Sequence, residues 1–276
     1  MKISVKELII PLALAVIAFL GLSTILYFFI HILNLFPIQA RIIPQLRLAD
    51  VLVGLTIYLK TSIDFAIFIG NLMRKNIGWK KRVAIEFGTA AGNALGTLFI
   101  LAIWYFLKEA PLLLVAMIII ASLVLLRMAE ESLEEFLHKR NFLAFHNSIS
   151  FLNQQVKLIN KITKPLLGRI SPNLSLTGIK EMSFFSLLFF SFTIPFILGL
   201  DDFAGYVPLF SVVNVFGFAV GVFLGHMLLN LGLFIMPKKT TKLVENSIVL
   251  LIGGVAFVGI ATWGFVEAIK ILLGFF

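Results

Sequence analysis

Long apolar runs are the feature that most constrains the fold of this chain. Hydrophobic residues make up 60% of its 276 residues and charged residues only 13%, about half the share typical of a soluble domain. The apolar residues gather in successive stretches of about 20, the length an α-helix needs to cross roughly 30 Å of hydrocarbon. The sequence therefore predicts an all-α integral membrane protein that has the lipid bilayer as its surroundings.

Seven transmembrane helices are predicted. The first, residues 7–33, follows a basic start, but its apolar stretch exceeds the roughly 7 to 15 residues of a cleavable signal peptide. The next spans are expected at 50–73, 83–107, 111–127, 186–210, 217–236 and 246–272. The boundary after the fifth span stays open, because it can also end at Gly199 and leave Asp201 and Asp202 in an exterior loop.

The spans divide the chain into four parts. Residues 1–49 hold the N-terminal helix and a connector, and 50–127 hold a first three-helix unit. Residues 128–178 begin with apolar residues at helical spacing and end in a stretch marked by Pro and Gly. They predict a cytoplasmic amphipathic helix on the membrane surface, followed by a linker. Residues 179–276 hold a second three-helix unit.

Lysine and arginine indicate the orientation. The densest clusters lie at 74–82, 127–169 and 237–242, and seven spans put all three on one side, with Lys2 and Lys6. By the positive-inside rule this side is the cytoplasm of a cell-membrane protein, so the N-terminus is inside and the C-terminus outside. The net charge of +9 reflects this bias, so no nucleic-acid partner is expected. The chain has no cysteine, which excludes thiol relays and thiolate metal sites.

An internal repeat relates the two three-helix units. A shift of 137 residues superposes Asp64 on Asp201, Gly88 on Gly225 and Asn93 on Asn230. Because each unit contains an odd number of spans, the second unit must enter the membrane from the side opposite to the first. Inverted repeats of this kind are typical of secondary transporters, whose site lies near the bilayer midplane.

Two short motifs carry a resemblance to a known family. The stretches "TSIDF" (61–65) and "GLDDFAGYVPLF" (199–210) resemble the two half-signatures of the cadmium-resistance transporters, members of the lysine-exporter (LysE) superfamily. The resemblance covers about 50–127 and 186–272, and it implies two three-span repeats and transport of a cation. The chain departs from the family pattern at three positions, Ser62, Phe65 and Asp202.

The acidic residues within the spans suggest a cation site. A charge in mid-span costs on the order of 2.5 to 3.5 kcal/mol, which favours a compensating ligand. Carboxylate and amide oxygens suit Ca²⁺, Mg²⁺ or Mn²⁺, and an imidazole shifts the preference toward Zn²⁺, Cd²⁺ or Mn²⁺. The predicted metal-binding residues are Asp64, Asp201, Asp202, Asn93, Asn230 and His226.

Each of these residues also has a structural interpretation. One aspartate can cap a helix end, the two asparagines can join helices by hydrogen bonds, and His226 can be a packed, hydrogen-bonded histidine. Glu86, four residues after Arg82, is expected to form a surface ion pair rather than to relay protons.

Three functions are compatible with these features. The first is a secondary transporter, an exporter of a divalent metal cation. The alternatives are an exporter of a cationic amino acid or small organic cation, and a membrane scaffold that transports nothing. The chain contains no GxxxxGK[ST], HExxH or GxSxG motif, so no enzyme activity is expected. No resident cofactor is expected either, and a homo-oligomer is compatible with the sequence.

Overall fold

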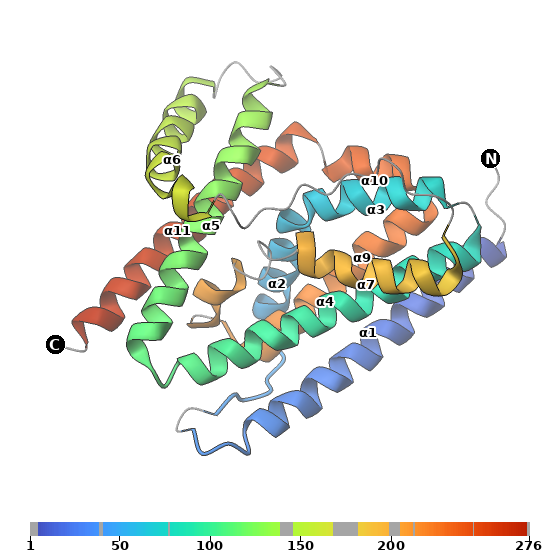
Figure 1. The fold of residues 1–276 in the computed structure, drawn as a ribbon, viewed down its shortest axis with the longest axis horizontal. Helices are drawn as coiled ribbons and strands as arrows, with labels where there is room; N and C mark the ends of the chain where they lie inside the picture. Colours follow the sequence, from blue (N-terminus) through green and yellow to red (C-terminus); the bar gives the residue numbers. More distant parts are fainter. Residues whose placement is uncertain are drawn as a thin grey trace.

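The computed structural model describes residues 5–38, 41–76, 78–138, 146–167, 182–198, 205–211, 213–244 and 246–274. All regular secondary structure in these ranges is helical (Figure 1). The helices are α1 (Val5–Leu33), α2 (Leu48–Thr61), α3 (Ile63–Lys75), α4 (Trp79–Leu107), α5 (Pro111–His138), α6 (His146–Leu167), α7 (Phe184–Leu198), the 3₁₀ helix η2 (Val207–Ser211), α9 (Val215–Ile235), α10 (Pro237–Val244) and α11 (Ser247–Leu273).

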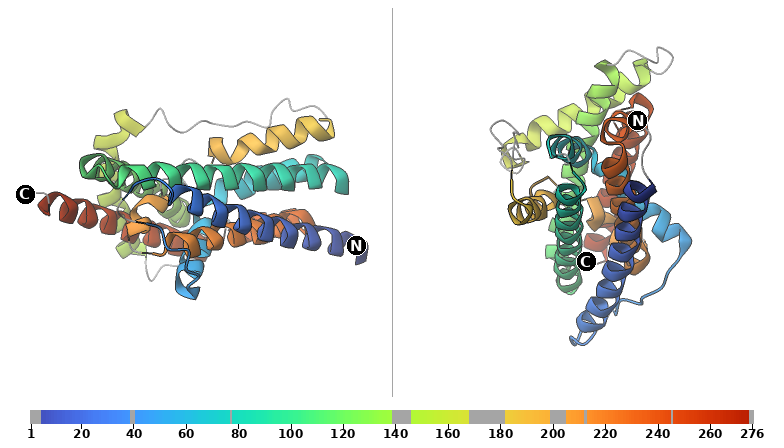
Figure 2. Two further views of the ribbon diagram at one scale, coloured as in Figure 1. Left: turned by 90° about the horizontal axis from the view of Figure 1, so that it is seen from below. Right: turned by 90° about the vertical axis from the view of Figure 1, so that its right-hand side faces the viewer.

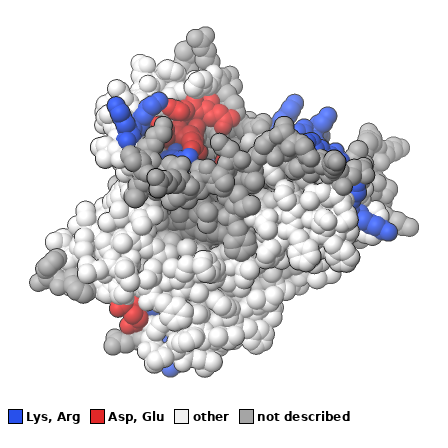
Figure 3. All heavy atoms as spheres, in the orientation of Figure 1, with Lys and Arg blue, Asp and Glu red and all other residues white. Residues whose placement is uncertain are grey.

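The helices confirm the predicted all-α membrane character. Five described helices, α1, α4, α5, α9 and α11, are long and apolar enough to cross a membrane, and the bent pair α2–α3 brings the number to six. The apolar part of α7, Phe184–Pro195, is shorter. In Figure 3 the described charges gather mainly at the upper and right-hand edges, and the face over α1 and α4 is almost uncharged.

The predicted second span is not one straight helix. α2 and α3 meet at an angle of 64°, and Ser62 between them has φ −85° and ψ 28°. Just before the break, the Thr61 hydroxyl donates to the Tyr58 carbonyl at 3.2 Å. Hydroxyl side chains that bond nearby carbonyls compete with regular helix geometry. The polar run Lys60–Ser62 therefore marks a break in a predicted span that is otherwise apolar.

The segment predicted to lie in the cytoplasm, residues 128–178, differs in its helices from the prediction. The amphipathic helix was expected to begin at about residue 128, but α5 continues to His138. Ala129, Leu133 and Phe136 are buried and extend the packed face of α5. Continuing the helix to His138 therefore buries additional apolar surface. The separate amphipathic helix is α6, and it reaches into the expected linker as far as Leu167.

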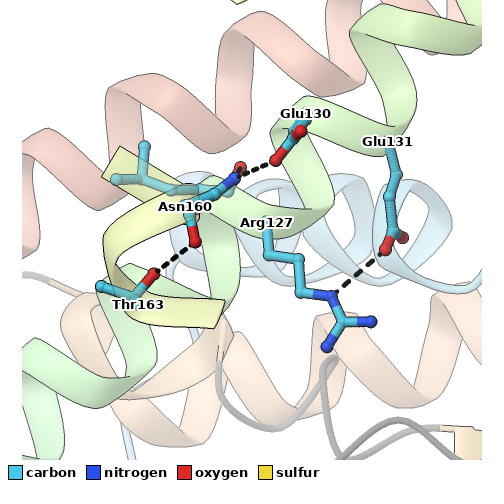
Figure 4. A network of polar contacts seen from close by, with 6 residues as sticks. Arg127, Glu130, Glu131, Asn160 and Thr163 are labelled. Atoms are coloured by element: carbon cyan, nitrogen blue, oxygen red, sulfur yellow. Dashed lines mark hydrogen bonds and ion pairs between the residues drawn. The ribbon is translucent and has the colours of Figure 1, made fainter. Parts of the chain in front are cut away.

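Polar contacts hold α6 on the extension of α5. The Asn160 side-chain nitrogen donates to the Leu126 carbonyl at 3.1 Å and to Glu130 Oε2 at 2.6 Å (Figure 4). The Lys157 ammonium forms an ion pair with Glu134 at 2.7 Å. Glu130 and Glu134 of α5 thus hold α6 in place.

The helices of the two predicted units exchange partners. α2 packs against α9, α7 against α4, and α5 against α11 (Figures 1 and 2). In the first pair a Cβ on Gly54 would lie 2.0 Å from the Phe218 carbonyl oxygen, and one on Gly221 would lie 2.1 Å from that of Val51. A Cβ on Gly225 would contact Tyr58. Because residue numbers rise together along both helices, α2 and α9 run parallel.

The second pair repeats this glycine packing. A Cβ on Gly88 would lie 2.4 Å from the Leu188 carbonyl oxygen, and one on Gly92 would lie 2.2 Å from that of Phe192. α4 and α7 therefore also run parallel. Glycines at these four positions let two backbones approach more closely than any side chain allows.

The corresponding helices of the two units run antiparallel. Arg82 of α4 donates to the Phe234 carbonyl of α9 at 2.6 Å, and Thr89, further along α4, meets Asn230, which precedes Phe234. In the third pair, Gly254 of α11 packs against Leu133 of α5, and Gly264 packs against Ser122. Residue numbers rise along α11 as they fall along α5, so these two helices also run antiparallel. α2 is parallel to α9, α7 is parallel to α4, and α4 is antiparallel to α9. It follows that α2 and α7 also run antiparallel.

Candidate functional site: a buried polar cluster between α2, α4 and α9

A stripe of polar side chains runs along one face of α4. Glu86, Thr89, Asn93 and Thr97 are spaced by three or four residues, so they share that face. All four are buried, and Glu86 is only 2% exposed. Buried polar side chains in an apolar crossing are costly unless they have partners.

The facing helix α9 contributes His226 and Asn230, both 0% exposed. The Asn230 side-chain nitrogen donates to Thr89 Oγ1 at 3.0 Å and to His226 Nε2 at 2.9 Å. The other ring nitrogen, Nδ1, lies 2.5 Å from the Tyr58 hydroxyl of α2. One hydrogen-bonded chain, which we call the polar cluster, thus joins Tyr58, His226, Asn230 and Thr89 across three helices.

The donor count assigns the protonation of His226. An amide nitrogen only donates, so Nε2 accepts from Asn230 and the ring proton sits on Nδ1. Nδ1–H then donates to the Tyr58 oxygen, and His226 is the neutral tautomer that this network selects. Protonating Nε2 as well would break the bond to Asn230. Binding a metal at either nitrogen would likewise displace Asn230 or Tyr58.

The polar cluster lies near the middle of α4 and α9. His226 lies near the centre of α9, and Asn93 is the central residue of α4. The Phe65 ring lies 5.5 Å from the imidazole, measured between ring centroids, and covers it from α3. The cluster therefore lies inside the interface between the antiparallel helices α4 and α9.

Several polar atoms around the cluster have no hydrogen-bond partner in the described part of the chain. They are both Glu86 carboxylate oxygens, the Asn93 amide nitrogen and the Asn230 amide oxygen. A buried polar atom without a partner costs about 1 to 3 kcal/mol. The helix pair α4–α9 thus keeps hydrogen-bonding capacity that its own contacts do not use.

The structure brings some of the predicted site residues together. Asn230 and His226 are hydrogen-bonded to each other, and Asn93 lies on the α4 face that carries Thr89. Asp64 stands in the first turn of α3 with its side chain exposed, apart from the buried cluster. Asp201 and Asp202 lie outside the described residues. Within the described ranges, no three His, Cys, Asp or Glu side chains are grouped closely enough to hold a metal ion.

The predicted surface ion pair of Glu86 is wrong. Glu86 is buried, and no described side chain donates to its carboxylate. The Arg82 guanidinium instead donates from Nη1 to the carbonyl of Phe234 at the end of α9. The helix was expected to lie at the surface at this point, but the packed helices bury Glu86.

The sequence also left Tyr58 and Thr89 out of the site. Thr89 was detectable in principle, since it falls on the helical stripe between Glu86 and Asn93. Tyr58 was not, because its role depends on the parallel packing of α2 on α9. No protein-family model, no curated protein and no solved structure matches this chain.

Proposed function

We propose that the chain is a secondary transporter of a divalent metal cation, with its cargo site at the crossing of α4 and α9. The observation that carries the proposal is the polar cluster. It is hydrogen-bonded, lies at mid-depth and joins helices of both predicted units. Ionisable and polar residues inside apolar membrane-spanning helices are typical of ion and substrate pathways.

In this proposal α1 precedes two inverted three-helix halves, and the seven crossings include the bent pair α2–α3 and the shorter α7. Helix positions support it: α2, α4 and α5 begin at 48, 79 and 111, and α7, α9 and α11 begin at 184, 215 and 247. Each helix of the first half thus has a counterpart in the second half that begins the same number of residues further along the chain. The exchanged pairing and the antiparallel counterparts are what inversion through the membrane plane requires.

Aromatic residues support a membrane-crossing α4. Trp79 and Trp104 stand near its two ends, about 38 Å apart at roughly 1.5 Å per residue. This separation fits a bilayer with its interfacial layers, where tryptophans gather. Lys108 lies 5.3 Å from the Trp104 ring centroid, and Lys270 5.1 Å from that of Trp263. The basic ends near Trp79 and α10 are assigned to the cytoplasm, and the N-terminus with them.

The ligand chemistry supports a metal cargo. The amide oxygen of Asn230 has no described partner, Asn93 lies on the facing stripe of α4, and Asp64, Asp201 and Asp202 are proposed to supply carboxylates along the path. Oxygen ligands of this kind suit hard divalent cations such as Ca²⁺, Mg²⁺ and Mn²⁺. An ion gradient or the membrane potential would drive transport.

Flux into proteoliposomes tests the proposal. The panel is Mn²⁺, Cd²⁺, Zn²⁺ and Ca²⁺ against lysine and arginine, with wild type, Asn230→Ala and Asn153→Ala. Asn153 is also a buried asparagine, but it lies on α6, so it is the matched control. We expect metal flux that Asn230→Ala abolishes and Asn153→Ala retains. Flux of lysine or arginine alone, or no flux of any kind, contradicts the proposal.

A further inference from the structure

We propose that Glu86 is the residue that carries the coupling proton of this protein. The inference rests on the proposed function, since a coupling proton exists only if the protein transports. It assigns a role to a side chain that the sequence assigned to a surface ion pair. Glu86 is proposed to exchange a proton with water, first on one side of the membrane and then on the other.

The burial of Glu86 is the first support. Its side chain is 2% exposed, and both carboxylate oxygens lack a hydrogen-bond partner in the described part of the chain. An ionised carboxylate without a donor or counter-ion is very costly to bury, and such a group avoids the cost by taking up a proton. The described conformation is therefore the one in which Glu86 holds its proton as a neutral carboxylic acid.

None of the charged side chains that the structure describes around Glu86 donates to its carboxylate. On α4 itself, Arg82 is bonded to the end of α9. α9 offers only His226, which the network keeps neutral, and α7 has no titratable side chain. α5 meets α4 near Ile100 and Trp104, at the far end from Glu86. The remaining charged or titratable side chains described on α1 and α3 are Tyr27, His31, Asp64, Arg74 and Lys75.

The position of Glu86 connects it to the cargo site. Glu86 precedes Thr89 by one turn on the same face of α4. Thr89 in turn accepts from Asn230. When α4 and α9 part, water reaches Glu86 and its carboxyl O–H releases the proton, which leaves one negative charge beside the cargo site. Cargo binding and protonation thereby become alternatives, as proton-driven exchange requires.

Infrared spectroscopy and flux test the inference on the full-length protein. The variants are Glu86→Gln, a neutral copy of the protonated side chain, and Glu267→Gln in α11 as the control, because Glu267 is only partly exposed but faces Lys270 at 3.6 Å. Wild type is expected to show a deuterium-sensitive C=O band of a protonated carboxyl. Glu86→Gln should lose this band and Glu267→Gln should keep it. A spectrum in which Glu86→Gln loses no such band overturns the inference.

Flux of ⁵⁴Mn²⁺ separates coupling from transport. Glu86→Gln should lose accumulation driven by a pH gradient, by about tenfold or more, and retain Mn²⁺/Mn²⁺ exchange. Retained accumulation, or loss of both, overturns the role proposed for Glu86. If wild type moves no Mn²⁺, the function itself is wrong for this cargo, and the infrared result alone decides the protonation of Glu86. Unchanged elution from a sizing column shows that each variant is folded.

Discussion

The close packing of α2 on α9 makes Gly54→Ala the most informative single substitution. A Cβ at this position would lie 2.0 Å from the Phe218 carbonyl oxygen and 3.1 Å from the Val222 backbone nitrogen. Both obstacles are backbone atoms, so no side-chain rotation relieves the clash. The two helices must move apart.

The size of the effect follows from the distances. Carbon–oxygen contacts in packed helices are about 3.3 to 3.6 Å, so the axes must separate by more than about 1 Å. The Tyr58–His226 bond, at 2.5 Å, would then stretch beyond normal hydrogen-bond length. Overpacking costs about 1 to 3 kcal/mol, and the lost bond adds about 1 kcal/mol. The helix gains about 0.5 to 1 kcal/mol from replacing glycine by alanine. We expect a net loss of roughly 1 to 3 kcal/mol.

The chain offers a matched control for this prediction. Gly21 lies in the middle of α1, and a Cβ there would meet nothing within 4 Å. Gly21→Ala should therefore leave the free energy of unfolding unchanged or raise it by up to about 1 kcal/mol. Both variants are measured by steric trapping or detergent titration in the same bilayer-mimetic. The reasoning is refuted if Gly54→Ala is as stable as Gly21→Ala.

Three further substitutions test the contacts. Tyr58→Phe removes the hydroxyl that is hydrogen-bonded to the His226 ring and should lower the free energy of unfolding by about 1 to 2 kcal/mol in the same titration; an unchanged value contradicts a stabilising bond between Tyr58 and His226. Asn160→Ala removes two bonds to α5 and should speed amide hydrogen exchange in α6 and not in α9. The hydrogen bond to Glu134 raises the pKa of Lys157 above its ordinary value of 10.5. The contact therefore helps to dock α6 fully at pH values below 10.5, and it is lost as the pH rises through the raised pKa. A spin label on α6 should report this release, and Glu134→Gln should remove its pH dependence.

The sequence predicted the all-α membrane character correctly, because candidate spans are set by length and hydropathy alone. The residues predicted to bind a metal include Asn93, Asn230 and His226, and the packed helices bury all three. The polar run Lys60–Ser62, where the α2–α3 pair is broken, is visible in the sequence. These features depend on local properties of the chain.

The errors have a tertiary origin. Glu86 was expected at the surface because Arg82 precedes it by one turn, whereas the packed helices leave it only 2% exposed. The extension of α5 to His138 depends on α6 and α11 covering its apolar face. Tyr58 entered the site only through the parallel packing of two helices from different halves. No pattern within one helix carries that information.

The inversion of the two halves is the central claim, and single-cysteine labelling tests it most directly. The chain has no cysteine, so the protein itself gives no background signal when an impermeant maleimide is added to intact cells. The positions are Lys75 and Val213, between the first and second helices of each half, and Glu109 and Lys242, between the second and third. Labelling from outside is predicted at positions 109 and 213 and protection at 75 and 242. If 75 and 213 respond alike, the halves are not inverted.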